Sequence, residues 1–387
     1  MLQIDGSYLL ETVVGLVEID SVNPSLVPGA AGEARIAEYV AGRLEELGLR
    51  VTRHEPEPGR VSVLGRLVGG NDGRSLMLNA HYDTVGVEDM RDPFSARVED
   101  GRLYGRGAYD MKGSLAAQMA AVKALLDAGI NLQGDLLIAA VADEEYASIG
   151  TADLLNHCHP DGAIVTEPTA LQTCLAHKGF IWLQVETRGR AAHGSRFDLG
   201  IDANMRMGRV LSELDRLEQA LRQRAPHPLV GPPSLHAATL QGGTELSMYA
   251  ASCRLGIERR TVPGEDADQI MAEIQQILER LAAADDTFQA QLETLLVREP
   301  FEVAPEAPVV RALDAATATV LGEPARHIGD TPWMDSALLA AAGVESVVIG
   351  PAGAGAHAAE EWVDLHSLEQ LAAILAETAI HYCGTSP

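Results

Sequence analysis

Lysine and long apolar runs are what this 387-residue sequence has least of. Its 29 basic residues include only three lysines, Lys112, Lys123 and Lys178, and its 55 Asp and Glu residues give a formal net charge of −26. An excess of negative charge repels phosphate backbones and anionic lipids, so neither nucleic acid nor a membrane surface is an expected partner. No apolar run approaches the roughly 20 residues that a transmembrane helix needs.

Cysteine is scarce as well. Cys158, Cys174, Cys253 and Cys383 lie far apart and form no CxxC pair. This spacing indicates reduced thiols rather than a disulfide framework or a cysteine-based metal site. The amino-terminal stretch MLQIDGSYLLETV lacks the basic segment before an apolar core that a signal peptide carries. Together these absences predict a cytoplasmic protein.

Four short apolar runs are each followed by potential metal ligands. The runs at 76–78, 135–142, 162–166 and 346–350 are typical of strands buried on both faces. Because the carboxyl ends of parallel strands meet at one edge of a sheet, the side chains that follow them should lie together. These side chains are His81 and Asp83, Glu144 and Glu145, Glu167, and His357, with Asp110 supplied by a Gly-rich loop before a helical segment near 115–126.

This collection of side chains predicts a metal site. Carboxylates seldom gather without a cation, because like charges repel and burial removes their hydration. One histidine at the end of a strand is more often structural than a ligand. Two histidines with three acidic side chains, however, are the ligands typical of a site for two divalent ions.

The chain is long enough for two domains, and its pattern changes near residue 177. Helices are expected near 6–19, 31–48 and 306–321, and further strands near 50–54 and 61–67. After residue 177, strands are expected at 180–189, 236–241, 245–250, 253–259 and 289–297, with helices at 202–222 and 266–284. The expected fold is therefore an α/β domain with a mostly parallel core, formed by 1–176 and 299–387. An α+β domain of residues 177–298 is inserted into it.

Five separated motifs carry a resemblance to a known family. HYDTV, GRGAYDMKG, ADEEYASIGT, VTEPT and GAHAAEEW occur in the order and spacing of the M20 metallopeptidases and deacylases. That family includes acetylornithine deacetylase, succinyl-diaminopimelate desuccinylase, carboxypeptidase G2 and aminoacylase. The resemblance runs from about residue 10 to 380 and implies a zinc-peptidase-like catalytic domain with an inserted lid that often dimerises.

The resemblance also implies roles for individual residues. Asp110 corresponds to the carboxylate that bridges two metals, zinc first, with Co²⁺ or Mn²⁺ as alternatives. His81 and Glu167 would complete one metal site, and Glu145 and His357 the other. Asp83 would orient His81, and Glu144 would be the general base.

Within the inserted segment the resemblance implies three further site residues. His193 would reach the active site of a neighbouring subunit, which predicts a homodimer formed through the lid. Arg260 would hold the substrate's α-carboxylate, a bidentate task that suits arginine, whereas Arg259 should be solvated. Ser247 and Ala250 stand where the family usually has Asn and Pro, so the substrate pocket departs from the family pattern.

The expected reaction is hydrolysis of an amide bond in an N-acyl amino acid, with Glu144 accepting a proton from the attacking water. A dipeptidase or carboxypeptidase of the same family, acting on short peptides, is the close alternative. A non-catalytic binding protein on the same scaffold is the alternative of another class. Asp335 and Glu361 match family positions as well, and either could instead pair with an arginine or cap a helix.

Overall fold

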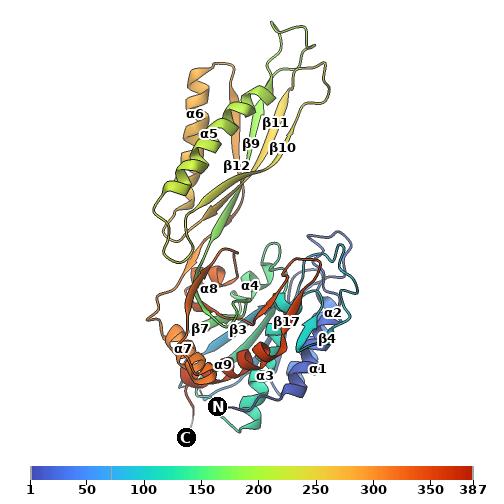
Figure 1. Cartoon of the computed structure of the whole chain (residues 1–387), viewed down its shortest axis with the longest axis vertical. Coiled ribbons are helices and arrows are strands. Elements are labelled where there is room, and N and C mark those ends of the chain that lie inside the picture. Colours follow the sequence, from blue (N-terminus) through green and yellow to red (C-terminus); the bar gives the residue numbers. More distant parts are fainter. Residues whose placement is uncertain (1, 71, 386–387) are drawn as a thin grey trace. The chain divides into compact units, whose positions relative to one another are not determined.

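The chain divides into two compact units, shown in Figure 1. The computed structural model describes residues 2–70 and 72–385. The first unit comprises Met1–Leu175, Val303–Ile328 and Met334–Pro387, and the second comprises Ala176–Glu302 and Gly329–Trp333. The second unit is thus built mainly from one continuous stretch in the middle of the sequence.

The first unit is organised around a mixed sheet. Its strand order is β1-β2-β6-β3-β7-β15-β8, and β14 also pairs with β8. The four strands β6, β3, β7 and β15 run parallel to one another, whereas β2 and β8 flank them in the antiparallel sense. The expected α/β class with a mostly parallel core is confirmed. The strands are β1 (Arg50–Glu57), β2 (Arg60–Leu67), β3 (Leu76–His81), β6 (Leu136–Val141), β7 (Gly162–Val165), β8 (Thr173–His177), β14 (His327–Asp330) and β15 (Glu345–Val348).

The central strands are mostly apolar because both faces are covered. Every residue of β3, β6 and β7 is buried. Helix α3 is also buried almost all round, and it contacts both α1 and α9, while α9 also contacts α7. A helix without a polar face belongs inside a protein core. The helices of this unit are α1 (Gly6–Val17), α2 (Ala34–Glu46), the short η1 (Ala108–Lys112), α3 (Gly113–Asp127), α4 (Ile149–Leu154), α7 (Pro308–Leu321), α8 (Ser336–Ala341) and α9 (Leu365–Cys383).

A small antiparallel sheet joins two distant parts of the chain within the first unit. Its order is β16-β17-β5-β4, and Trp362 of β17 pairs with Tyr104 of β5. This pairing brings the loop before Asp110 beside the loop that carries His357. The strands are β4 (Arg97–Glu99), β5 (Arg102–Tyr104), β16 (Gly353–Ala354) and β17 (Trp362–Asp364).

The second unit is an antiparallel sheet with helices packed against it. The strand order is β10-β11-β9-β12, and residues along β9 alternate between buried and half-buried. Such alternation is typical of a sheet with one face in a core. Buried side chains from α5 and α6 share one apolar cluster with β9 and β11. The elements are β9 (Gly179–Arg188), α5 (Ala203–Gln223), β10 (Ser234–Gly242), β11 (Ser252–Thr261), α6 (Ala267–Ala284) and β12 (Gln289–Arg298). The short β13 (Phe301–Glu302) pairs with the last residues of β8 instead of joining this sheet.

The strand expected at 245–250 is wrong. Strand β10 ends at Gly242, and Gly243 has φ +78°, a conformation that few other residues adopt. The apolar side chain of Leu246 is fully exposed in the loop that follows. The alternation of apolar and polar residues at 245–250 therefore does not indicate a strand. No helix among the described residues combines the length and apolar character needed to cross a bilayer.

The expectation that Arg259 is solvated is also wrong. Arg259 is fully buried, because it lies on the same face of β11 as Cys253, Leu255 and Ile257, which fill the core. Its guanidinium contacts Glu265 at 2.5 Å and donates to the carbonyl of Arg260. A buried charge is tolerated only with such partners.

Replacing Arg259 should therefore destabilise the second unit. Breaking a buried ion pair costs about 3–5 kcal/mol, and the partial exposure of Glu265 places Arg259→Ala near about 3 kcal/mol. Urea unfolding measures this loss. Arg254→Ala is the matched control, since Arg254 lies on the same strand with its side chain 62% exposed. Equal losses of stability in the two variants would contradict the stabilising role of Arg259.

Candidate metal centre

The expected ligands come together at one edge of the parallel sheet, within the first unit. His81 is the last residue of β3, Glu144 and Glu145 follow β6, and Glu167 follows β7. Since β6, β3 and β7 are adjacent and parallel, their carboxyl ends lie side by side. The neighbouring Asp110, in η1, and His357, in the loop before β17, complete the group.

Asp110 lies between the two histidines. Its Oδ1 is 3.0 Å from Nε2 of His81, and its Oδ2 is 3.3 Å from Nε2 of His357. On one side, Glu167 Oε1 is 3.5 Å from His81 Nε2. On the other side, Glu145 Oε2 is 3.1 Å from His357 Nε2. One carboxylate thus faces two separate imidazole–carboxylate pairs.

Three carboxylates that are buried or nearly buried face one another around Asp110 and the two histidines. Burial raises the pKa of Glu144 and Glu167 well above the usual value, even though His81 lowers it. Burial also raises the pKa of Glu145, and the negative charge of Asp110 adds to the rise. Without additional positive charge, these side chains cannot all be ionised together. The site therefore has the electrostatics of a cation-binding pocket.

The imidazoles of His81 and His357 supply part of the positive charge that these carboxylates need. Burial opposes protonation of His81, but its hydrogen bond to Asp110 and the charge of Glu167 outweigh that effect and raise its pKa well above normal. Hydrogen bonds to Asp110 and Glu145 raise the pKa of His357 to about 10. In turn, hydrogen bonds from His357 and His81 overcome burial and lower the pKa of Asp110.

The donor set fits divalent metal ions. Ligands held at the usual 2.0–2.2 Å from an ion lie about 3.0–3.5 Å from one another, and the distances across Asp110 fall in that range. Two groups of three side chains have ligand atoms within 4.8 Å of one another, one made of His81, Glu144 and Glu167 and one of His81, Asp110 and Glu145. Mixed imidazole and carboxylate ligands suit zinc and its neighbours.

Asp83 is buried behind the ligands and holds the loop that carries two of them. Its carboxylate accepts hydrogen bonds from the backbone N–H of Glu144 at 3.1 Å and of Glu145 at 3.3 Å. His81 Nδ1 lies 2.9 Å from the backbone oxygen of Asp83 and 3.7 Å from its carboxylate. Asp83 thus fixes both the imidazole and the adjacent glutamates.

A buried polar network supports Asp83, and no motif in the sequence indicates it. Asn23 donates to Asp83 at 2.8 Å and to Asp143 at 3.1 Å. Arg60 is buried between Asp143 and Glu33. Asp143 adopts φ +69°, a left-handed conformation that turns the chain sharply after β6. These residues come from distant segments, so only the fold relates them.

Glu361 and Asp335 are both buried around the centre. Glu361 accepts hydrogen bonds from the backbone N–H of Tyr109 and Asp110 at 3.0 and 3.1 Å, and from Arg106 at 2.7 Å. It therefore positions the backbone of Asp110. Asp335 accepts a hydrogen bond from Thr151 in α4, and burial raises its pKa to about 6.

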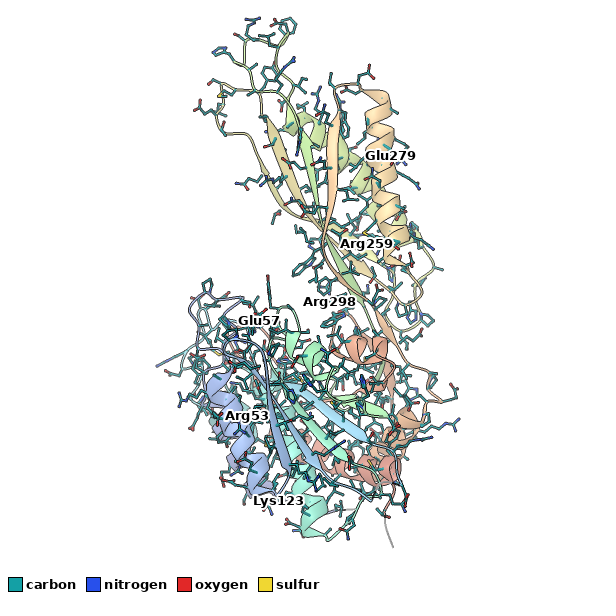
Figure 2. The ribbon with its side chains drawn as sticks, turned by 180° about the vertical axis from the view of Figure 1, so that it is seen from behind. Arg53, Glu57, Lys123, Arg259, Glu279 and Arg298 are labelled. Atoms are coloured by element: carbon teal, nitrogen blue, oxygen red, sulfur yellow. The ribbon has the colours of Figure 1, made fainter. Side chains whose placement is uncertain are left out.

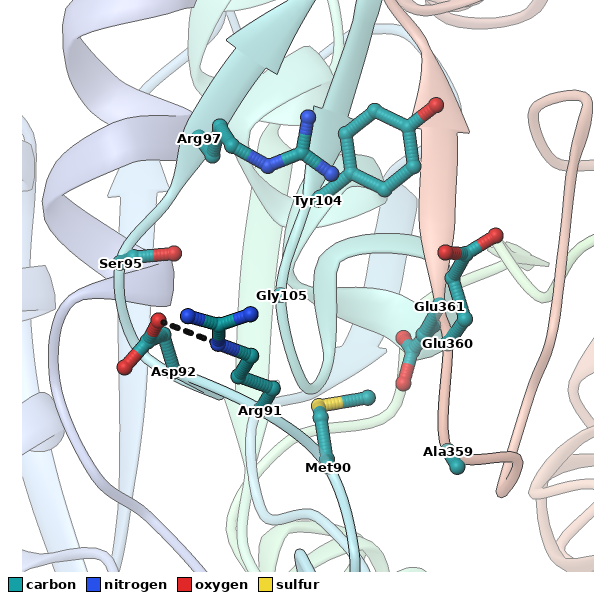
Figure 3. A pocket seen from close by; sticks show the side chains of 10 residues that line it. All are labelled: Met90, Arg91, Asp92, Ser95, Arg97, Tyr104, Gly105, Ala359, Glu360 and Glu361. Carbon is teal, nitrogen blue, oxygen red and sulfur yellow. Dashed lines mark ion pairs between the residues drawn. The ribbon is translucent and has the colours of Figure 1, made fainter.

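A hollow of about 700 Å³ lies beside the small sheet (Figure 3). Its lining includes Arg91, Arg97, Tyr104, Glu360 and Glu361. Arg91 pairs there with Asp92, as the dashed line shows. None of the five expected ligands is among the described residues that line this hollow, whereas Glu361, which positions the backbone of Asp110, is one of them.

The remaining expected site residues belong to the second unit. His193 is exposed, with Nδ1 2.8 Å from the hydroxyl of Ser195. Ser247 is exposed in the next loop, and its carbonyl accepts from Gly194 at 2.7 Å. Arg260 lies on β11, donates to Glu258 at 2.6 Å and stacks over Phe180 at 5.2 Å.

A mixed sheet that gathers imidazoles and carboxylates at one edge has the ligand types of the metal-dependent hydrolases. Residues 77–381 match peptidase family M20/M25/M40, and the chain belongs to this M20 family of metal-dependent amide hydrolases. The resemblance seen in the five motifs is thereby confirmed.

Characterised relatives cover nearly the whole chain. It is 30% identical to acetylornithine deacetylase of Myxococcus xanthus over 90% of this chain and 92% of that protein. It is 29% identical to N-formyl-4-amino-5-aminomethyl-2-methylpyrimidine deformylase of Bacillus subtilis, covering 92% and 91% of the two chains. A dinuclear metal-binding peptidase of the family from Bacillus subtilis has a similar fold, with a TM-score of 0.75, 16% identity and coverage of 98% and 99%.

Asp83→Asn should weaken metal binding by about 10- to 100-fold, the usual effect of removing a residue that orients ligands. The amide keeps the size of the side chain, but it loses the charge that the two backbone N–H groups and His81 face. Competition with a chromophoric zinc chelator measures the change. Asn23→Ala, which leaves both backbone hydrogen bonds in place, should have a smaller effect. Unchanged affinity in a folded Asp83→Asn variant would contradict this role.

Proposed function

We propose that this protein is a dinuclear metal-dependent deacylase that hydrolyses the amide bond of an N-acyl amino acid. The position of Asp110 between His81 and His357 is the observation that carries the proposal. The 30% identity to an acetylornithine deacetylase supports an acyl amino acid as substrate. Buried Cys174, Cys253 and Cys383 fit the reducing cytoplasm expected from the sequence.

In this proposal Asp110 would be shared by two ions, most simply zinc. His81 and Glu167 would hold the first ion, and Glu145 and His357 would hold the second. Two such ions, when bound, supply the Lewis acidity that polarises an amide carbonyl and acidifies water. Co²⁺ and Mn²⁺ accept the same ligands and are the alternatives.

Glu144 is proposed as the general base. Its side chain is nearly buried, with Oε2 4.0 Å from His81 Nε2, while the backbone N–H of Glu144 is fixed by Asp83. In this role it accepts a proton from the attacking water and donates it to the leaving amine.

Glu144→Gln should abolish turnover and retain the metal ions, because the amide keeps the shape of the side chain but cannot accept the proton. Loss of a general base costs roughly 10²–10⁴-fold in rate. Glu145→Gln, its neighbour, should instead lose metal. Rates with N-acetyl amino acids, measured beside metal content, separate the two effects. A Glu144→Gln enzyme retaining more than about a tenth of the wild-type rate would place the base elsewhere.

Arg260 is proposed to hold the α-carboxylate of the substrate, with Ser247 as a shorter partner than the family's Asn. Its guanidinium is oriented by Glu258 and by the ring of Phe180. A planar guanidinium binds a carboxylate through two parallel hydrogen bonds, which lysine cannot do.

Arg260→Ala should lower kcat/KM for substrates with a free carboxylate by roughly ten- to a hundredfold, since hydrogen bonds to charged groups contribute about 1.5–3 kcal/mol. The matching amides and methyl esters should lose far less, and Arg254→Ala should change neither. Ser247→Asn should shift preference towards smaller N-acyl amino acids if the pocket is adapted to a bulkier substrate. Equal wild-type rates on acids and amides would overturn the carboxylate assignment.

His193 is proposed to complete the active site of a second subunit in a homodimer formed through the second unit. The loops around it expose large apolar side chains, with Phe197 82% and Leu246 108% exposed. Residues of β10, at one end of the sheet order, are exposed as well. Surfaces of this kind are typical of association sites.

Mixing two inactive variants, His193→Ala and Glu144→Gln, should restore part of the activity. Hybrid dimers would contain one site with both functional residues. Incubation under conditions that allow subunit exchange, followed by an activity assay, tests this. Full activity of a wild-type monomer at assay concentration would exclude the arrangement.

A peptidase of the same family is the second candidate, because the relative of similar fold from Bacillus subtilis is a peptidase. The deformylase relative adds N-formyl amines as a third group of compounds to test. Hydrolysis of N-acetyl, N-succinyl, N-formyl and dipeptide substrates with Zn²⁺, Co²⁺ or Mn²⁺ distinguishes these. Turnover of dipeptides alone would replace the deacylase proposal.

A further inference from the structure

A second cluster of metal-binding side chains lies on the surface of the first unit, apart from the Asp110 centre. His54, Asp153 and His157 offer ligand atoms that all lie within 4.8 Å of one another. His54 belongs to β1, the strand whose Arg53 and Glu57 are labelled in Figure 2. Asp153 belongs to α4, and His157 lies just beyond the end of that helix. We propose that these three side chains bind one zinc ion, which joins β1 to α4.

The two imidazoles already lie against each other. Their ring centroids are 4.5 Å apart with an angle of 43° between the planes. Nε2 of His157 is 3.7 Å from Oδ1 of Asp153. Ligands of one zinc ion lie about 3.0–3.5 Å apart, so small side-chain rotations would bring all three into a coordination sphere. Two imidazoles and a carboxylate leave a fourth tetrahedral position for water.

His54 also has a neighbour of the kind that metal-bound histidines usually have. Its Nε2 is 2.9 Å from the hydroxyl of Thr52. When the Thr52 hydroxyl accepts a hydrogen bond from Nε2–H of His54, the lone pair of Nδ1 remains available to bind an ion. Such a hydrogen bond on the second ring nitrogen fixes the tautomer of most histidine ligands. Partial burial and the nearby His157 lower the pKa of His54, which favours the neutral, ligating form.

An ion at this position would hold a segment that also supports the Asp110 centre. Helix α4 follows the loop of Glu144 and Glu145, and its Thr151 contacts both Asn79 of β3 and Asp335. These contacts fasten one side of the helix to the sheet. The proposed ion would fasten its carboxyl-terminal end to β1. Its expected effect is therefore on stability, because an ion that binds only the folded chain stabilises it.

Counting bound ions tests the proposal. The complete protein is dialysed against Zn²⁺, and zinc per chain is measured for wild type, His54→Gln, His157→Gln and His159→Gln. His159 is an exposed histidine beside the cluster and outside it, so it is the matched control. Wild type and His159→Gln should bind one ion more than either of the other variants. They should also gain more in melting temperature when zinc is added.

Two further readouts keep the result unambiguous. All four proteins should hydrolyse substrate at the same rate, since none of the changes touches the Asp110 centre. With Cu²⁺ as the probe, electron paramagnetic resonance should detect two imidazole nitrogens at a site that His157→Gln loses. His157 is half exposed, so this variant should fold even if His54→Gln does not. Equal zinc counts in all four proteins would overturn the proposal, whereas failure of the Asp110 centre would lower all four counts together.

Discussion

Mutual repulsion among buried carboxylates is the constraint on which the rest of this structure depends. Asp110, Glu144, Glu145 and Glu167 meet at one edge of the sheet, and Asp83, Asp335 and Glu361 lie buried around them. Each is desolvated, and like charges at short range raise the free energy of the folded state. The fold can keep these side chains together only by supplying positive charge and hydrogen-bond donors.

The chain supplies part of this compensation itself. Arg60 and Arg106 are buried against Asp143 and Glu361, and backbone N–H groups satisfy Asp83 and Glu361. His81 and His357 contact Asp110 directly. These partners surround the centre but leave Glu144 and Glu167 facing each other with raised pKa values. Divalent cations are the charges that complete such an arrangement, which is why the geometry and the proposed chemistry agree.

The gathering of these candidate ligands at one sheet edge could be predicted from the sequence because it depends on a local rule. A buried strand followed at once by His or Glu places that side chain at the carboxyl edge, wherever the rest of the chain runs. The positions of His81, Glu145 and Glu167 follow from this rule. Asp110 and His357, delivered by loops, needed the family motifs as well.

The supporting residues could not be predicted, because their roles depend on tertiary contacts. Nothing near Asn23 or Arg60 in the sequence points to Asp83 or Asp143. Arg259 was expected in solvent, on the face of the strand opposite Arg260, but that face is the one that packs in the core. Its place on the core-facing side of β11 is set by the register of the strand and by Glu265, six residues away. The loop at 245–250 was predicted to be a strand because its apolar and polar residues alternate. Alternation alone does not reveal whether a side chain is buried.

The most direct test of the central claim is a crystal structure of the zinc-loaded protein with anomalous data collected at the zinc edge. The account predicts two anomalous peaks about 3.5–4 Å apart, one on each side of the Asp110 carboxylate. One peak should lie between His81 and Glu167, and the other between Glu145 and His357. A single peak at full zinc loading, or two peaks that do not share Asp110, would contradict it.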